Sequence, residues 1–153
     1  MASPAFYEDF EVGSSYEFGE YQVTEEEILQ FASMYDPQAF HLSDEAAKKT
    51  LFGGLCASGW HTCSMAMRMI VDNMPEGESG SLGSPGIDEL RWSIPVFPGD
   101  QLRMKTTILE KKESRSRPEM GSISMLNEVM NQNDDVVMSN KPIVLFRKRK
   151  PAN

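Results

Sequence analysis

The stretch "GWHTCSMAMRMIVDNMPEG", residues 59–77, determines the fold expected for this sequence. Its apolar side chains recur at steps of three and four residues, which is the period of an α-helix. The residues with this spacing are Trp60, Cys63, Met67, Ile70 and Met74. Met65, Ala66 and Met69 make much of the other side apolar as well, so we expect a long helix that is buried nearly all round. Pro75 and Gly77 end it.

The chain changes its period from about four to two after this helix. Apolar and polar residues alternate over 89–94 and 101–109, and further strands are predicted at 122–130 and 136–146. A fifth strand is predicted at 14–23, before the helix. One long helix and about five strands joined mostly by short turns indicate an antiparallel α+β domain, with the helix packed on one face of the sheet. The length of 153 residues favours a single domain, residues 1–153.

The segment between the first strand and the long helix carries helix start and stop signals. Thr24 and Glu27 have the spacing of a capping box, so a helix is predicted to begin there. Pro37 disfavours helical backbone at the residue before it, and Asp36 should therefore leave the helix. A short helix follows with Ser43 as its expected cap, and residues 51–59 read as a tight loop close to the core.

Composition limits the partners and the compartment. The formal charge is −8, from 15 basic and 23 acidic residues, which argues against nucleic acid as a partner. Two basic stretches, 110–119 and 147–150, are interpreted as solvated hairpin tips and ends, with contact to an anionic ligand as the alternative. We expect the protein in the cytoplasm, with the interior of an organelle as the alternative location. Its two cysteines are free, and the sequence shows no signal peptide and no apolar run long enough to span a membrane.

Asp36 and His41 are the first candidates for chemistry. They stand five residues apart with a proline between them. An aspartate beside a histidine can hold the imidazole in one tautomer, or the two can share a water, and either arrangement gives a group that takes up and returns a proton. The alternative is a turn in which Asp36 only accepts a hydrogen bond at the helix end and His41 lies on the surface.

The start of the long helix is the second candidate. If Ser58 caps it, the backbone N–H groups of Gly59, Trp60 and His61 are unpaired donors at the positive end of the helix dipole, where an oxyanion would be stabilised. Glycine at position 59 would let a substrate carbonyl approach closely. The alternative is that Gly59 is small because the sheet crosses the helix there. His61 is interpreted as a packing or capping residue rather than a catalytic one.

Other kinds of active site are disfavoured. Ser58 and Ser64 lie outside any G-x-S-x-G motif, and neither Cys56 nor Cys63 has a plausible catalytic partner. The chain has no phosphate-binding loop and no dinucleotide fingerprint. Two histidines without clustered carboxylates argue against a catalytic metal, so neither a metal nor another cofactor is expected.

Three blocks, "YDPQAFHLSDEAA" at 35–47, "FGGLCASGWHT" at 52–62 and "LRWSIPVFPGD" at 90–100, resemble in that order the signature blocks of the MaoC-like dehydratases. This family includes the (R)-specific enoyl-CoA hydratases and has the hotdog fold, a long helix wrapped by an antiparallel sheet. The resemblance implies a homodimer or higher homo-oligomer that hydrates an enoyl thioester of CoA or an acyl-carrier protein, or dehydrates the 3-hydroxyacyl product. It implies Asp36 and His41 as the catalytic pair, with the Gly59 amide on the thioester carbonyl.

The first block departs from the family pattern. The best-characterised hydratases carry D-x-N-P-x-H, whereas this chain has D-P-Q-A-F-H, with Gln38 where asparagine stands. Gln38 could supply a similar amide, and we expect it to join Ser58 and Gly59 in binding the substrate. Two other functions stay open: a hotdog thioesterase, and a non-catalytic module that binds acyl-CoA or an acyl-carrier protein.

Overall fold

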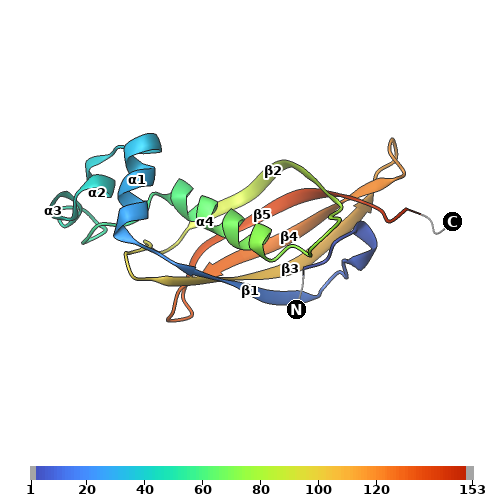
Figure 1. The fold of residues 1–153 in the computed structure, drawn as a ribbon, viewed down its shortest axis with the longest axis horizontal. Helices are drawn as coiled ribbons and strands as arrows, with labels where there is room; N and C mark the ends of the chain where they lie inside the picture. The colour runs from blue at the N-terminus through green and yellow to red at the C-terminus, as the bar shows by residue number, and fades with distance from the viewer. Residues whose placement is uncertain (1–2, 151–153) are drawn as a thin grey trace.

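A five-stranded antiparallel sheet with one long helix across its inner face forms the body of the protein, as the computed structural model shows for residues 3–150 (Figure 1). The strands lie in the order β1-β3-β4-β5-β2. Their bounds are β1 Ser15–Gln22, β2 Ser81–Trp92, β3 Gln101–Glu113, β4 Met120–Met130 and β5 Val136–Arg147. The helices are the 3-10 turn η1 Tyr7–Asp9, α1 Glu25–Tyr35, α2 Ala39–Leu42, α3 Asp44–Ala47 and α4 Gly59–Asp72. This is the antiparallel α+β domain that the sequence pattern predicted, in the hotdog arrangement that the resemblance implied.

Helix α4 is anchored to the sheet by one apolar stripe. Met65, Ala66 and Met69 are buried in one cluster with side chains of the inner sheet face. The sheet members of this cluster include Leu102, Met104, Val129 and Met138. A second apolar cluster lies around η1 and includes Tyr7, Phe10, Ile108, Ile123, Met125 and Phe146. Burial of the α4 stripe therefore sets the position of the helix on the sheet.

The prediction that α4 is buried nearly all round is wrong. Trp60 is 60% exposed, Met67 53% and Val71 50%. The apolar pattern of the helix is as predicted, but the sheet covers only one of its faces. The other face remains open because no described element lies over it (Figure 1).

The short helices α1, α2 and α3 gather at one end of the molecule, beside the first residue of α4 (Figure 1). Two of the expected caps are present: Thr24 Oγ1 accepts the amide of Glu27 at 3.2 Å, and Ser43 Oγ accepts that of Ala46 at 3.2 Å. The backbone of Asp36 leaves the helical region at φ −146°, as the following proline requires. His41 lies on the short helix α2, which the sequence analysis did not predict.

Strand β2 begins at Ser81, eight residues before the predicted strand. Its first eight residues, "SLGSPGID", are rich in the glycine, serine and proline that usually mark loops. The strand pairs with β5 alone, with several shifts of register, and forms one edge of the sheet. Pairing with β5 therefore outweighs the weak local preference for a strand.

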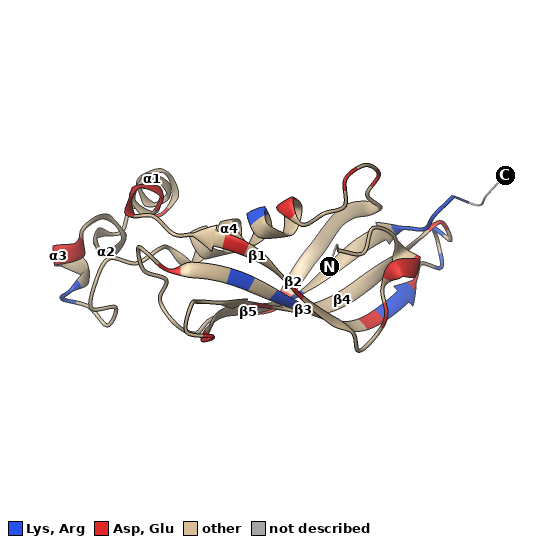
Figure 2. Cartoon of the chain, turned by 60° about the horizontal axis from the view of Figure 1, so that its bottom comes forward, with Lys and Arg blue, Asp and Glu red and all other residues tan. Residues whose placement is uncertain are grey.

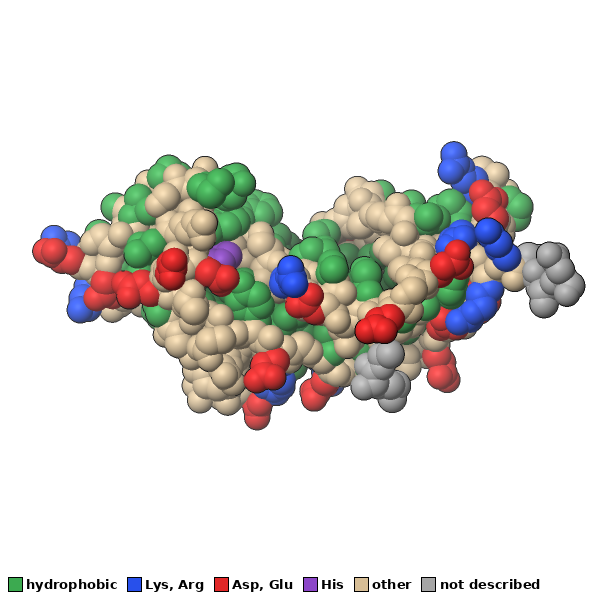
Figure 3. Space-filling model, in the orientation of Figure 1, with side chains coloured by type: hydrophobic (Ala, Val, Ile, Leu, Met, Phe, Trp, Pro, Cys, Tyr) green, Lys and Arg blue, Asp and Glu red, His purple; other side chains and the backbone are tan. Residues whose placement is uncertain are grey.

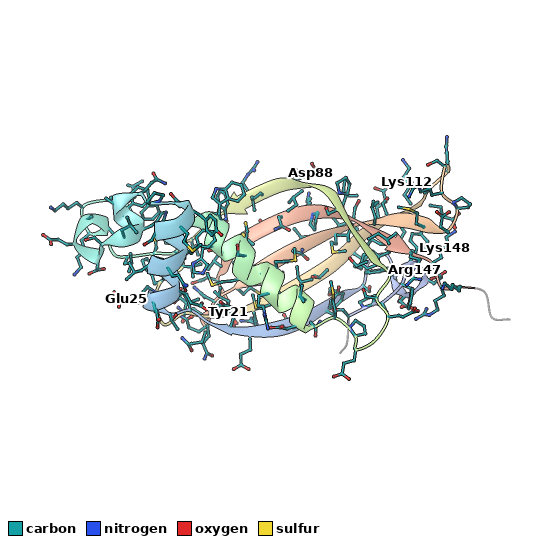
Figure 4. All side chains as sticks on the ribbon, turned by 45° about the horizontal axis from the view of Figure 1, so that its top comes forward. Tyr21, Glu25, Asp88, Lys112, Arg147 and Lys148 are labelled. Carbon is teal, nitrogen blue, oxygen red and sulfur yellow. The ribbon has the colours of Figure 1, made fainter. Side chains whose placement is uncertain are left out.

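The basic stretches lie mainly at the end of the molecule opposite α1–α3 (Figure 2). Lys112, Arg147 and Lys148 all lie at this end (Figure 4). Lys148 Nζ pairs with Glu113 at 2.7 Å, and Arg149 pairs with Asp9. Part of this basic charge is thus neutralised within the chain. No helix among residues 3–150 is long and apolar enough to cross a membrane.

Replacing Met104 should test the core beneath α4. Its side chain is fully buried, at 0% exposure, so Met104→Ala should lower the free energy of unfolding by about 2–5 kcal/mol. Leu51→Ala is the control, because Leu51 is fully exposed and its loss should change the free energy by less than about 0.5 kcal/mol. Urea unfolding followed by circular dichroism measures both. Equal stabilities for the two variants would contradict this description of the core.

Candidate active site

The loop of residues 51–58 brings the candidate site together because hydrogen bonds fix it on two sides. Asp44 Oδ1 accepts the amide of Leu55 at 2.9 Å, which ties the loop to α3. The amide of Ala57 donates to the carbonyl of Val96 at 2.8 Å, which ties it to the segment after β2. Cys56 and Ser58 are consequently buried where the loop enters α4.

Asp36 is held by two side chains that donate to different carboxylate oxygens. Gln38 Nε2 donates to Oδ1 at 2.7 Å, and Ser58 Oγ donates to Oδ2 at 2.7 Å. Gln38 is a near neighbour along the chain, whereas Ser58 comes from the start of α4. Ser58 and Gln38, both expected to bind the substrate, are hydrogen-bonded to Asp36 in the structure.

The pKa of Asp36 is lowered from its ordinary value of 3.8. Burial opposes this change, because a carboxylate loses hydration when it leaves water. The hydrogen bonds from Gln38 and Ser58 stabilise the charged form and, with the nearby His41 ring, outweigh burial. Asp36 is therefore a carboxylate at neutral pH.

His41 is fixed in one orientation by a buried hydrogen bond. Its Nδ1 lies 2.8 Å from the carbonyl oxygen of Cys56, which can only accept, so Nδ1 carries the hydrogen. The ring packs edge-on against Phe40, with centroids 4.5 Å apart. In the neutral imidazole Nε2 then presents a lone pair, 3.5 Å from Asp36 Oδ2. The two groups face one another without a tight hydrogen bond between them.

The first turn of α4 lies directly beside this pair. Ser58 is the N-cap residue of the helix, but its side chain makes no capping hydrogen bond, since it is bonded to Asp36. The indole of Trp92 covers Gly59, and a Cβ at this position would lie 2.5 Å from the ring. Glycine is thus required here for packing. The first amides of α4 are left without a side-chain cap.

His61 is separate from the Asp36 network. Its ring is buried and stacks on Phe31, with centroids 4.8 Å apart and planes 6° from parallel. Burial lowers the pKa of His61, which keeps the imidazole neutral. Its burial and its stacking on Phe31 agree with the interpretation of His61 as a packing residue.

The structure therefore joins Asp36, Gln38, His41 and Ser58 in one network, with Gly59 next to Ser58 along the chain. Sequence reasoning missed the Cys56 carbonyl, for which no side chain gives a signal, and the Trp92 ring. Only the alternation of apolar residues over 89–94 hinted that Trp92 faces inward. Among residues 3–150, no three histidine, cysteine or carboxylate side chains come together as a possible metal site.

The comparison with protein families agrees with this geometry. A family model described as "MaoC like domain" matches residues 9–146, which include every strand up to Phe146 and the whole Asp36 network. The chain belongs to the MaoC-like domain family.

Relatives of this MaoC-like protein include enzymes that act on CoA thioesters. Mesaconyl-CoA hydratase of Cereibacter sphaeroides is 28% identical over 149 residues, which cover 96% of this chain and 42% of that enzyme. The 3-hydroxybutyryl-CoA dehydratase of Methylorubrum extorquens is 25% identical and is matched over 88% of its length and 97% of this chain. YdeM of Bacillus subtilis, an uncharacterized protein, is 26% identical over 92% of this chain and 98% of its own.

Solved structures show the same fold. The MaoC-like dehydratase of Rhodospirillum rubrum superposes with a TM-score of 0.89 at 38% identity, covering 97% of this chain and all of its own. The R-hydratase PhaJ1 of Pseudomonas aeruginosa superposes with a TM-score of 0.71 at 22% identity, over 97% of this chain and 92% of its own. The second likeness supports the fold alone.

Removing the hydroxyl of Ser58 should raise the pKa of Asp36, because the carboxylate loses one of its two side-chain donors. The pKa of Asp36 in wild type and Ser58→Ala can be read from the NMR shift of its carboxyl carbon. Ser64→Ala is the matched control on α4, since Ser64 donates to the Trp60 carbonyl. An unchanged pKa in Ser58→Ala would contradict the network.

The lowered pKa of Asp36 also makes the free energy of unfolding depend on pH. Because it is lower in the folded chain than in the unfolded one, the carboxylate stabilises the fold at pH values above the unfolded pKa. This contribution disappears as pH falls through the folded pKa. Ser58→Ala should reduce it, so the variant and wild type should converge in stability below both pKa values, as acid unfolding series would show.

Proposed function

We propose that this MaoC-like protein catalyses the reversible hydration of a trans-2-enoyl thioester. The observation that carries the proposal is the Asp36–His41 pair. Its imidazole is held in the tautomer whose Nε2 lone pair faces Oδ2 of a carboxylate at 3.5 Å, beside the first turn of α4. Two acceptors so placed can bind both hydrogens of one water molecule, which leaves an oxygen lone pair free to attack.

Water adds across the double bond in this reaction. The water oxygen bonds to C3 while one of its protons passes to the Asp36–His41 pair. Electron density moves through C2 onto the thioester oxygen, and the pair then returns a proton to C2. The sum is one water added, and the reverse steps dehydrate the 3-hydroxyacyl thioester. The reaction needs no cofactor, because the thioester itself stabilises the negative charge.

The uncapped first turn of α4 suits the growing negative charge on the thioester oxygen. The Gly59 amide lies at the positive end of the helix dipole, and no side chain caps this end. Donors fixed in advance at such a position stabilise an oxyanion more in the transition state than in the ground state. The hydratase and dehydratase among the relatives act on CoA thioesters, which supports this assignment.

Substituting the pair tests the mechanism directly. Asp36→Asn and His41→Gln should each slow hydration of crotonyl-CoA by about 10²–10⁴-fold, the range for loss of positioned proton transfer. The measurement is the decrease in ultraviolet absorbance as the conjugated double bond is hydrated. Asp72→Asn is the control, because Asp72 is an exposed partner of Arg68 on α4. Full activity in Asp36→Asn would rule the mechanism out.

The same assay separates the two other functions. A thioesterase would release free CoA thiol, which a thiol-reactive dye detects, without prior loss of the double bond. If the protein is a binding module, wild type and Asp36→Asn should bind the acyl-CoA with the same affinity in calorimetry. Neither protein should then convert it to product. Hydration that depends on Asp36 excludes both.

We further propose that the protein works as a homodimer joined through β2. This strand is an edge of the sheet, where unpaired backbone groups can accept another strand. Leu82, Ile87 and Trp92 on it are 50%, 51% and 45% exposed, an unusual amount of apolar surface for a monomer. A second copy of β2 would pair with this strand and cover these side chains.

A charge placed on this edge should separate the subunits. Ile87→Glu should shift the molar mass measured by light scattering from a dimer toward a monomer, because pairing would bury the new carboxylate. Leu51→Glu is the control, since Leu51 is fully exposed in a loop away from β2. Wild type that is monomeric at micromolar concentration would refute the dimer.

A further inference from the structure

Two hydrogen bonds join the short helices α2 and α3 to the loop of residues 51–58. His41 Nδ1, on α2, donates to the Cys56 carbonyl at 2.8 Å, and Asp44 Oδ1, at the start of α3, accepts the amide of Leu55 at 2.9 Å. The two bonds end on neighbouring residues of the loop. One bond alone would let the His41 ring pivot about its acceptor, whereas two bonds fix the helices and the loop in one relative orientation.

The peptide unit between Cys56 and Ala57 passes this orientation to the His41 ring. Its carbonyl accepts from His41, and its N–H, on Ala57, donates to the Val96 carbonyl at 2.8 Å. Because a peptide unit is planar, its carbonyl cannot turn away from His41 without also breaking the bond to Val96. Cys56, Ala57 and Val96 are all buried, so little water can replace either bond.

Asp44 holds the side of this peptide on which the backbone is least restrained. Gly53 and Gly54 directly precede Leu55, and Gly53 has a φ of +71°, in the left-handed region that glycine favours. Within residues 3–150, Asp44 is the only side chain that accepts a hydrogen bond from an amide of residues 53–58. Without Asp44, the amide of the buried Leu55 would lose its partner, and the loop would have to shift to find another.

Exposure alone would make Asp44 an ordinary surface residue. Several carboxylates are exposed at the α1–α3 end of the molecule (Figure 3), and the Asp44 side chain is itself 51% exposed. Its Oδ2 pairs with Lys48 at 2.9 Å, and a surface ion pair of this kind contributes little to stability. The bond to the Leu55 amide sets Asp44 apart, and it is the largest cause of the lowered pKa of this carboxyl group.

The neutral His41 ring has one ring hydrogen and two acceptors that compete for it. The Cys56 carbonyl lies 2.8 Å from Nδ1, and Asp36 Oδ2 lies 3.5 Å from Nε2. The closer carbonyl keeps the hydrogen on Nδ1, which leaves Nε2 able to accept a proton. If the carbonyl moved away, the hydrogen would be better placed on Nε2, because the charged carboxylate is the stronger acceptor. Nε2 would then have no lone pair for a proton from water.

We infer that Asp44 is a positioning residue, which holds the Cys56 carbonyl against Nδ1 and so keeps His41 in the tautomer that can act as a base. The effect on turnover rests on the proposed function, whereas the effect on the tautomer does not. Asp44 acts through the loop backbone and bonds to none of the groups of the Asp36–His41 pair. Its loss should therefore lower kcat and leave KM nearly unchanged.

The first test compares three variants in the hydration of crotonyl-CoA. Asp44→Ala should lower kcat about 10–100-fold, because a displacement of about 1 Å in a reacting group can cost this much, with KM within about twofold. Asp44→Asn keeps an oxygen that can accept from Leu55 but lacks the charge, so its kcat should lie between those of Asp44→Ala and wild type. Lys48→Gln removes only the ion pair and is the matched control, with wild-type kcat expected.

Nitrogen NMR of protein labelled in histidine reads the tautomer directly. At about pH 8.5 an ordinary imidazole is neutral, and the shifts of its two nitrogens show which one carries the hydrogen. His41 should carry it on Nδ1 in wild type and in Lys48→Gln, and on Nε2 in a substantial fraction of Asp44→Ala. The chain has two histidines, so His41→Gln assigns the signals. Unchanged signals of His61, which stacks on Phe31 outside the network, show that a variant keeps its fold.

The outcomes separate the role of Asp44 from the reaction. If Asp44→Ala loses the fold, Asp44→Asn takes its place in the comparison. Wild-type hydration with an unchanged His41 tautomer in the variant would overturn the inference, whatever its kcat, and would leave the proposed function intact. If wild type does not hydrate crotonyl-CoA but the variant changes the tautomer, the proposed function fails and the role of Asp44 stands. No hydration together with an unchanged tautomer would overturn both.

Discussion

Burial of one stripe of α4 against the sheet is the constraint on which the rest of the structure depends. The stripe contains Met65, Ala66 and Met69, and the sheet contributes a matching apolar surface. This contact sets where the first residue of α4 lies and hence where the loop before it must end. It also leaves the opposite face of the helix uncovered, since a single sheet can bury only one side of a helix. The position of the site at one end of α4 follows from this geometry.

Ser58 shows how a local rule is broken at the site. A serine at the N-cap normally accepts a hydrogen bond from the first turn, and losing such a cap costs about 1 kcal/mol. Here the hydroxyl donates to Asp36 instead, which joins the α1–α3 end to α4 and leaves the first amides of the helix uncapped. Both effects serve the proposed reaction, because one fixes the carboxylate and the other leaves donors for an oxyanion. Departures of this kind are expected at functional sites rather than in supporting structure.

Periodicity and proline chemistry made much of the fold predictable. The helical spacing from Gly59 onward located α4, and Pro37 located the point at which Asp36 leaves α1. The open face of α4 was not predictable, because an all-apolar pattern looks the same whether one side or both are covered. The first eight residues of β2 were not predicted because glycine and serine disfavour a strand. The helix that carries His41 has only four residues, too few to show a helical period. The contacts of the site depend on a backbone carbonyl, on a hydroxyl from a distant part of the same chain and on strand register. None of these has a sequence signal of its own.

The lowered pKa of Asp36 determines how the proposed pair divides its work. A carboxylate stabilised by Gln38 and Ser58 is a weaker base than an ordinary aspartate. In the proposed reaction, this favours Nε2 of His41 as the group that takes the proton from water. The His41 ring has the Cys56 carbonyl 2.8 Å from Nδ1 and Asp36 Oδ2 3.5 Å from Nε2. In the proposed reaction, Asp36 would orient the water and balance the charge, while His41 would carry the proton from water to C2. The hydrogen bonds that weaken Asp36 as a base thus assign the proton transfer of the proposed reaction to His41.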